Sequence, residues 1–513
     1  MPRLNSKFRT GGRQARRAML VAAAASMAVA GFVAVSSARA DTTDVLLEQL
    51  KAKGILTNHE YHKLKVRHQA EKASYYRHSG PPGGMIVKGP APEYVTVCPK
   101  HVCMHVGQVD VTLSGDLVFF GTESFQSRAS GTALSGGVAG GLAGGSTHNA
   151  TNAIEGGLLP SALVLNLATH QMGYDLGFTI GAYVGGNNIE PNIVNANGGG
   201  SPVALGTAGI DLRQVFGTIG TPGFGTVKVG RDLGLFGSDA ILNDATLLGV
   251  GTSAATSAPG NTTLGRIGIG YVYADWIPQV TYTTPDFNGF TASVGAFTPL
   301  DTTDLFGLSN YASINGAEAP MIQGQIKYKG ALGPGAKLTL SADALWQEHR
   351  VDTSSFVDVP TGAAISSWGI DGFGKVDVAG FSFVGYGYYG KGLGTTGLFL
   401  DGFTEDGQQR ASYGGYGQGS YTWDKFTIGA SWGISVLQAN SCDNNGTFTG
   451  ACGYSFYDTA NMLKSNQSYV GFARYQLTSW MAIQGEYVHS ISTNQTGGKI
   501  QADQIDLGTA WFF

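Results

Sequence analysis

The four cysteines are the residues whose spacing most directly suggests chemistry, and they fall into two local pairs: Cys98 with Cys103, and Cys442 with Cys452. In an oxidising compartment, each pair predicts a disulfide that closes a short loop. The alternative for the first pair is a metal site, because His101 and His105 lie in the same eight residues. Zinc-ligand pairs are usually separated by a hairpin or a helix. The spacing therefore favours two disulfides and predicts no metal site.

Three other patterns resemble catalytic or cofactor motifs only by their letters. Residues 385–390 fit G-x-G-x-x-G, but they lie in an alternating glycine and aromatic stretch with no helix after it. Aromatic packing over a backbone gap explains that pattern better. Residues 59–62, His-Glu-Tyr-His, lack the spacing of a zinc protease. Glu486 and Asp506 belong to no pattern that places them in a shared pocket. The sequence therefore predicts no enzyme and no cofactor.

The composition indicates what kind of scaffold must position these residues. The chain has 513 residues, of which 78 are Gly, while charged residues make up 13% and aromatic residues 11%. After the N-terminus, no apolar run reaches the roughly 18 residues that a membrane-spanning helix requires. Low charge combined with abundant Gly, Tyr and Phe is typical of a barrel that presents lipid on one face and water on the other.

Residues 1–40 have the organisation of a signal peptide. Basic residues precede an apolar stretch at 19–35, and Ala38-Arg39-Ala40 forms a cleavage site before Asp41. The alternative is an N-terminal anchor helix. The abrupt polarity after the cleavage site favours export, so the mature protein is expected beyond the inner membrane.

Residues 41–74 are expected to form a periplasmic helical hairpin. Apolar residues repeat at helical spacing from Leu46 to Leu56, and a capping box at 57–60 begins a second helix. This hairpin is too short to bury a core of its own, so it should self-associate or dock, with a solvated spacer as the alternative. Residues 75–97 are rich in proline and glycine and are expected to be a linker.

Residues 98–513 alternate between strand patterns, short turns and long loops. Sixteen strands are expected, at 105–122, 161–170, 174–184, 206–219, 224–231, 276–284, 290–297, 320–329, 336–348, 365–376, 380–391, 410–422, 426–437, 464–476, 480–491 and 500–513. Short turns at one end and long loops at the other are typical of an antiparallel transmembrane β-barrel. A propeller would show repeated blades, and a sandwich rarely needs so many strands.

The last strand, 500–513, shows the alternation clearly. Ile505, Leu507, Trp511 and Phe513 fall on one face of a period-2 strand, and most polar or small residues fall on the other. In a closed barrel, this strand should pair with residues near 105–122 and so remove the free sheet edge. A soluble sandwich strand is the alternative for this segment alone.

With the strands placed, residues 98–513 resemble the general porins of Gram-negative bacteria. The local matches are Gly-Thr-Val-Lys-Val-Gly-Arg at 225–231, Tyr-Thr-Thr-Pro-Asp-Phe-Asn-Gly-Phe at 282–290, and the terminal Phe513. Residues 93–98 together with Cys103 resemble the start of alphaproteobacterial porins. The hairpin at 41–74 resembles the periplasmic N-terminal extension of some outer-membrane porins.

This resemblance implies a trimer of sixteen-stranded barrels in the outer membrane, each with a water-filled pore narrowed by an inward-folded third loop. That loop is 232–275, with the acids Asp232, Asp239, Asp244 and Asp275. The basic residues that would face them from the barrel wall are Arg213, Lys228, Arg231 and Arg266. Thr281 and Thr283 stand where the family usually offers an inward arginine. Trp511 and Phe513 resemble the terminal signal that the outer-membrane assembly machinery recognises.

The charge distribution bears on what such a pore would admit. Residues 98–513 contain 17 Lys and Arg against 30 Asp and Glu, a net charge of −13, which argues against nucleic acid as a partner. Acids lining a lumen would favour cations, and opposed charges across a narrow passage would order water and admit small polar solutes. The expected function is passive diffusion of small hydrophilic solutes across the lipid of the outer membrane.

Two alternatives remain at this point. One is a channel selective for sugars or anions. The other is a structural barrel in which residues 41–74 contact the cell wall.

Overall fold

The structure is a computed structural model, and it divides the chain into two compact units, residues 1–28 with 95–513, and residues 29–94. It describes residues 65, 95–97, 103–128, 134, 136–138, 150–184, 210–252, 262–302, 317–350, 362–404, 407–444 and 461–513. The predicted signal peptide, and the helical hairpin apart from Lys65, lie outside the described residues. The predicted linker does too, apart from its last three residues, which form a short strand.

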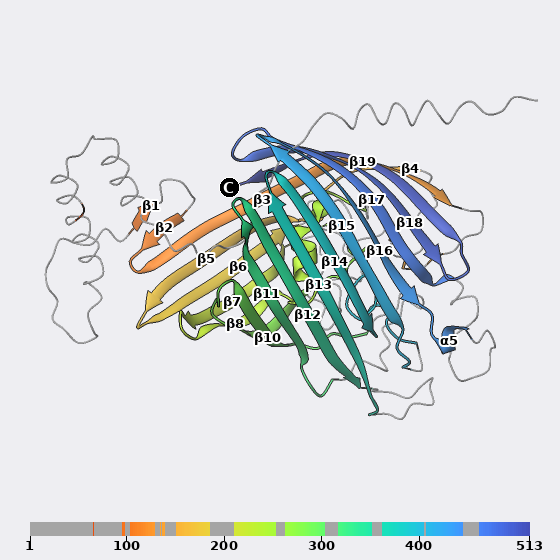
Figure 1. The fold of residues 1–513 in the computed structure, drawn as a ribbon, viewed down its shortest axis with the longest axis horizontal. Coiled ribbons are helices and arrows are strands. Elements are labelled where there is room, and N and C mark those ends of the chain that lie inside the picture. Colours follow the sequence, from red (N-terminus) through yellow and green to blue (C-terminus); the bar gives the residue numbers. More distant parts are fainter. Residues whose placement is uncertain are drawn as a thin grey trace, which may run out of the picture. The chain divides into compact units, whose positions relative to one another are not determined.

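Antiparallel strands make up most of the described chain (Figure 1). They are β1 (Val95–Val97), β2 (Cys103–Val106), β3 (Val109–Arg128), β4 (Ala150–Glu155), β5 (Ser161–Gln171), β6 (Tyr174–Val184), β7 (Ile210–Thr221), β8 (Gly225–Leu233), β9 (Trp276–Thr283), β10 (Phe290–Phe297), β11 (Met321–Gly333), β12 (Ala336–Arg350), β13 (Ala364–Val378), β14 (Phe381–Lys391), β15 (Ala411–Trp423), β16 (Phe426–Gln438), β17 (Leu463–Gln476), β18 (Met481–Asn494) and β19 (Lys499–Phe512). The described chain also contains three short helices: α4 (Ser238–Asn243), η2 (Ala245–Leu248) and α5 (Ser441–Asn444).

Sixteen of these strands, β3 and β5 to β19, form a closed ring. Each pairs with its neighbours in sequence order, and β19 pairs with β18 on one edge and with β3 on the other. The register at the closure sets Trp511 opposite Leu117 and Ile500 opposite Arg128. The predicted sixteen-stranded antiparallel barrel is therefore confirmed. Within the described residues, no helix is long and apolar enough to cross a membrane.

The predicted strand bounds are close to those observed, and β6 and β10 begin and end at the predicted residues. The first strand is the main correction, since it spans 109–128 rather than 105–122. Gly107, with φ of 62°, turns the chain there, so that the preceding residues form β2 and fold back on β3. Consequently β19 pairs with residues 116–128, further along than predicted. The three short helices correct the expectation that only strands follow residue 98.

The side chains of the ring have the opposite arrangement to those of a soluble sheet, because apolar residues are exposed and polar residues are buried. In β19, Ile505 and Leu507 are 43% and 62% exposed, whereas Asp506 between them is 2% exposed. The same alternation runs through β11 to β18, where glutamines, serines and carboxylates occupy the buried face and aromatic and aliphatic residues the exposed face. This arrangement suits a barrel whose outer face meets lipid and whose inner face meets polar groups.

Exposed aromatic residues gather at the end of the ring that carries the short turns. Trp423, Trp480 and Trp511 are each between 42% and 54% exposed, and Phe513 packs on Trp480 with ring centroids 5.9 Å apart. Aromatic side chains at this level are typical of the interface between lipid and water. The closing strand thus ends within a girdle of aromatic side chains.

Candidate pore constriction

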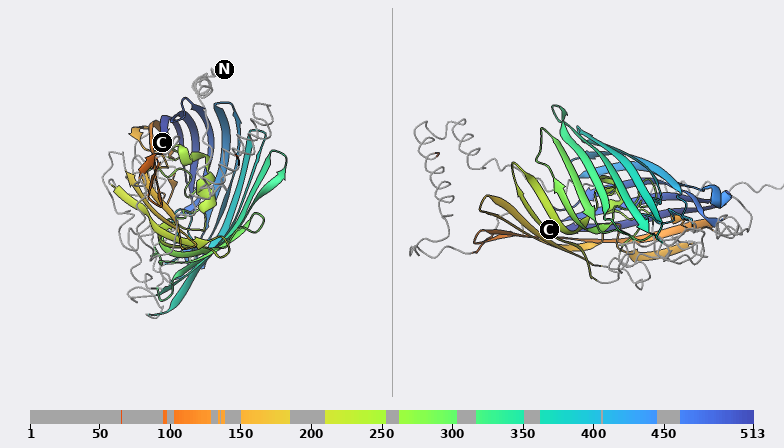
Figure 2. Two further views of the ribbon diagram at one scale, coloured as in Figure 1. Left: turned by 90° about the vertical axis from the view of Figure 1, so that its left-hand side faces the viewer. Right: turned by 90° about the horizontal axis from the view of Figure 1, so that it is seen from below.

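The long segment between β8 and β9, described at 234–252 and 262–275, packs against the buried face of the ring. In the left view of Figure 2, its helical part is surrounded by strands. It forms hydrogen bonds with side chains of strands far from it in sequence: Gln323, Asp371, Gln418, Arg474, Glu486 and Gln504. Six strands from β11 to β19 therefore hold one loop.

The start of the segment is anchored through its backbone. The amides of Leu235 and Phe236 both donate to Oε1 of Gln323, at 2.7 and 3.0 Å. The amide of Gly237 donates to Oδ2 of Asp371 at 2.9 Å. Gly237 has a φ of 74° and precedes α4 without any side-chain cap, so Gln323 and Asp371 of the wall bind three consecutive amides as the chain enters the helix.

The middle of the segment is bound in the same way by β15. The hydroxyl of Tyr416 donates to the carbonyl of Ala240 at 2.8 Å. Gln418 accepts from the amide of Ala245 at 2.7 Å and donates to the carbonyl of Asn243 at 3.1 Å. A glutamine that both accepts and donates fixes the position of the chain as it leaves α4.

The part of the segment that follows η2 rests on a buried carboxylate. Oε2 of Glu486 accepts from the amides of Val250 and Gly251 at 2.8 and 3.0 Å, and Gln504 donates to the carbonyl of Gly251 at 2.8 Å. A Cβ atom on Gly249 would lie 1.8 Å from Oε1 of Glu486. A side chain at 249 would therefore displace the Glu486 carboxylate from its present position.

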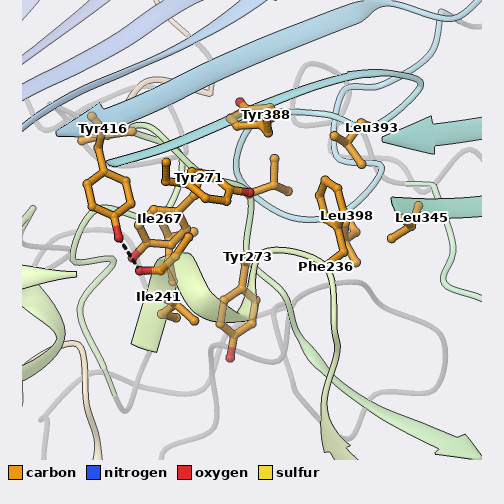
Figure 3. Packing of buried hydrophobic residues seen from close by; sticks show 14 of the residues in the cluster. Phe236, Ile241, Ile267, Tyr271, Tyr273, Leu345, Tyr388, Leu393, Leu398 and Tyr416 are labelled. Atoms are coloured by element: carbon orange, nitrogen blue, oxygen red, sulfur yellow. Dashed lines mark hydrogen bonds between the residues drawn. The ribbon is translucent and has the colours of Figure 1, made fainter. Parts of the chain in front are cut away.

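An apolar cluster holds the segment on one side of the interior, and Figure 3 shows its packing. Phe236, Ile267 and Tyr271 are completely buried and pack with residues of β12 to β15, including Leu345 and Tyr388. The rings of Tyr271 and Tyr416 meet edge to face with centroids 5.9 Å apart. Such contacts favour one fixed loop position rather than a range of positions.

A second segment, 392–404, joins this cluster and was not predicted to do so. Its residues Leu393, Leu398 and Phe399 are completely buried in the same cluster. The amide of Tyr273 donates to the carbonyl of Thr396 at 2.8 Å, which links the two segments directly. Arg410 holds the base of the second segment and forms two 2.8 Å bonds with the carboxylate of Asp443. The sequence pattern of an irregular loop carried no indication of this burial.

The four predicted acids occupy different environments. Asp232 is the penultimate residue of β8 and pairs with Lys228, while Asp239 lies in the first turn of α4, 2.8 Å from Nζ of Lys327. Asp244 caps η2 and accepts from the hydroxyl of Tyr271 at 2.9 Å. It therefore serves the loop's own structure, whereas Asp232 and Asp239 pair with lysines of the wall.

Asp275 immediately precedes β9 and is 2% exposed. Its carboxylate accepts from the amide of Trp276 at 2.6 Å, and its φ is 57°. Burial raises the pKa of Asp275 to about 7, although the Trp276 amide, Arg231 and Arg213 all oppose the shift. This carboxyl group therefore changes charge near neutral pH.

The predicted basic residues are also divided between environments. Arg213 and Lys228 lie on the inner face, where Arg213 pairs with Asp211 at 2.8 Å and Lys228 lies over the ring of Phe216. Arg213 is the extra residue of a bulge opposite Gly181 and Ala182.

Arg266, by contrast, belongs to the loop and not to the wall, which corrects the prediction that it would project from a strand. It is completely buried, donates to Ser431 and lies over the ring of Tyr416 at 5.2 Å. Arg231 acts electrostatically on Asp275 from the end of β8. The structure thus gathers Arg213, Lys228, Asp232 and Asp275 near β7 to β9 and puts Arg266 on the opposite, apolar side.

Thr281 faces inward and is 3% exposed, as its position in the alternation predicts. It donates to Gln279 at 2.7 Å. The wall cations that the prediction missed include Lys327, Lys375 and Arg474, each at an inward position of its strand. Strand alternation alone could have placed them, because each lies an even number of residues from buried polar residues of the same strand and so points to the same face.

Cys103 is disulfide-bonded. Cys98 and Cys452 lie outside the described residues, as does the side chain of Cys442, so both predicted pairings stay predictions. No group of His, Cys, Asp or Glu in the described part of the chain has the arrangement of a metal site.

No protein-family model and no curated protein sequence matches the chain. The fold is similar to that of the outer-membrane channel DcaP of Acinetobacter baumannii, with a TM-score of 0.54 and 15% identity over 79% of this chain and 97% of that one. An anion-selective porin from Comamonas acidovorans aligns with a TM-score of 0.49 and 15% identity, over 79% of this chain and all of that one. At these identities the likeness concerns the fold. The finer resemblance to alphaproteobacterial porins stays a prediction.

Proposed function

We propose that this protein is an outer-membrane porin through which small hydrophilic solutes and ions diffuse passively. The observation that carries the proposal is the inverted alternation of a closed sixteen-stranded ring, with apolar side chains outside and polar side chains inside. Such a ring needs lipid around it and water within it. We infer that the segment between β8 and β9 narrows the lumen, because its described parts, 234–252 and 262–275, lie against the inner face and are bound to six strands.

The decisive experiment is single-channel recording with the full-length protein in planar lipid bilayers. We expect stepwise conductance that rises linearly with salt concentration and a weak cation preference in a KCl gradient, which the acidic excess of residues 98–513 would produce. Absence of conductance from protein shown to be folded would overturn the proposal. Saturation with one solute would favour the alternative of a selective channel.

We further propose a homotrimer. On the outward face of β18 and β19, Asp503 accepts from Tyr487 at 2.7 Å and lies 2.8 Å from Nδ1 of His489. Ionisable groups on a lipid-facing surface are costly, and contact between protomers would shield them. Light scattering of the detergent-solubilised protein measures the mass directly, and a monomer would contradict this assembly.

The terminal residue supports a role in assembly. The amide of Phe513 donates to Gly115 O at 3.1 Å, and the amide of Gly115 donates to Phe513 O at 3.3 Å. Phe513 thus extends the pairing that closes the ring, and its side chain is 40% exposed. Deleting Phe513 should lower the amount of inserted protein more than it changes the conductance of the molecules that insert. Unchanged membrane levels would contradict this role.

Contact of residues 41–74 with the cell wall remains a second proposal, tested by deleting those residues and measuring envelope attachment.

A further inference from the structure

Four lysines cluster on the inner face of three adjacent strands, near the end of the ring that carries the short turns. Lys327 and Lys329 lie on β11, Lys337 on β12 and Lys375 on β13. Residues 98–513 contain only ten lysines, and none of these four was among the predicted constriction residues. We call them the lysine patch.

The strand register places the four side chains together. Lys329 lies opposite Thr339, which lies opposite Lys375, so these three form one row across the sheet. In the adjoining rows, Lys327 lies opposite Ser341, and Lys337 precedes Thr339 at the neighbouring inward position of β12. Neighbours in such rows are close enough for long side chains to reach a common ligand.

The charge of the patch is only partly neutralised. Lys327 pairs with Asp239 at 2.8 Å, and Nζ of Lys375 lies 3.8 Å from Asp377. Among the ion pairs of the described residues, none involves Lys329 or Lys337, and both side chains are exposed. Two further carboxylates, Asp343 and Asp371, face each other across β12 and β13 in the row beyond Ser341.

Those two carboxylates are buried under α4 rather than exposed to the lumen. Asp343 and Asp371 are 5% and 8% exposed, and Asp371 is bound by the Gly237 amide and by the Tyr386 hydroxyl. The solvent-exposed charge near the short turns is therefore predominantly positive. A low-dielectric wall behind such a patch strengthens its attraction for anions.

Hydroxyl groups complete the chemistry of the patch. Ser341 is 7% exposed, and its Oγ is buried with no hydrogen-bond partner among the described residues. It lies opposite Lys327 and beside Thr339 on the same inward face. An oxyanion held by the ammonium groups would accept hydrogen bonds from such hydroxyls, which a bare cation would not do.

We propose that the lysine patch is a binding site for small multivalent anions that carry phosphate or carboxylate groups, on the short-turn side of the constriction. The inference rests on the proposed channel function, to which it adds a solute class. A net cation preference for simple salts and a local anion site are compatible, because the first depends on the charge of the whole lumen and the second on four side chains.

The test compares the double variant Lys329→Gln/Lys337→Gln with Lys391→Gln. Lys391 is exposed on the outward face of β14, the same face as Tyr389, so K391Q removes a lysine without changing the lumen. Inorganic pyrophosphate is the probe. Calorimetry on the detergent-solubilised full chain should give a Kd about tenfold or more weaker for the double variant and unchanged for K391Q. All proteins must show the heat-modifiable gel mobility of folded wild-type barrel.

Recording in bilayers then separates this inference from the function on which it rests. Pyrophosphate should reduce the wild-type current and should do so at about tenfold higher concentration for the double variant. Equal binding by wild type and the double variant, or an equal loss in K391Q, would overturn the anion site. Pyrophosphate binding by a protein that never conducts would instead overturn the channel and leave the site standing.

Discussion

On one side of the barrel interior, Phe236 and Tyr271 pack without exposure among aromatic residues of β14 and β15. On the other side, near β7 and β8, Lys228 pairs with Asp232 while its side chain stays 29% exposed. We call these the apolar side and the polar side. The first resembles the core of a soluble domain, and the second resembles a solvated surface turned inward.

The difference separates two tasks that a constricting loop must perform. A loop inside a wide barrel loses conformational entropy when it takes one position, and ion pairs that stay in contact with water compensate little of that cost. Burial of large apolar side chains compensates much more. We therefore infer that the apolar side fixes the loop, whereas the polar side determines which ions pass it.

The largest effect is expected from Phe236→Ala on the apolar side. Phe236 is completely buried, and its ring packs close to Gly369 of β13. Removing a buried phenyl ring costs about 3–5 kcal/mol. Thermal unfolding followed on heat-shift gels should show a much lower midpoint, and single-channel currents should become noisier as the loop moves. The matched control is Leu242→Ala, in α4 of the same segment, where the side chain is 53% exposed. An equal loss in the control would contradict the assignment of the apolar side.

The sequence predicted the ring far better than it predicted these contacts. Alternation is a local property, so strands such as 174–184 could be bounded from their own residues. The bonds from Gln323 to Leu235 and Phe236 join residues nearly ninety positions apart, and no local pattern encodes them. For the same reason Arg266 was expected on the wall, since an arginine in an irregular loop gives no sign of which surface it will meet.

The next effect is expected from Glu486→Ala, which removes the acceptor for the Val250 and Gly251 amides. Leaving buried amides without a partner costs about 1–3 kcal/mol. Hydrogen exchange at these two amides should become faster, while exchange in β18 itself should change little. Glu486→Gln retains one acceptor oxygen, so exchange at these amides should be slower than in Glu486→Ala and faster than in the wild type. Glu123→Ala, on the exposed face of β3, is the control that removes a carboxylate without touching the loop. Protected amides in the Ala variant would show that Glu486 does not hold the loop.

A smaller, pH-dependent effect is expected at Asp275. Because burial raises the pKa of Asp275 to about 7, its contribution to stability is complete below the ordinary carboxyl pKa and is lost as pH rises through about 7. Between pH 6 and pH 8 this amounts to about 1 kcal/mol. Asp275→Asn should remove that part of the pH dependence, and asparagine also tolerates the positive φ. Unfolding midpoints of both proteins at the two pH values provide the measurement. An identical pH response in the two proteins would mean that another group titrates.

The smallest effect on stability, and the sharpest test of the division, is expected from Lys228→Gln on the polar side. The partly exposed pair with Asp232 contributes less than about 1 kcal/mol, so the unfolding midpoint should scarcely change. The variant removes a positive charge facing the lumen and leaves Asp232 without its lysine, so the reversal potential in a KCl gradient should move toward stronger cation preference. Lys425→Gln, in the exposed turn between β15 and β16, removes the same charge and should leave the reversal potential nearly unchanged. Lost stability with unchanged selectivity would instead show that the polar side, too, holds the loop, because the charge would then act on packing and not on passing ions.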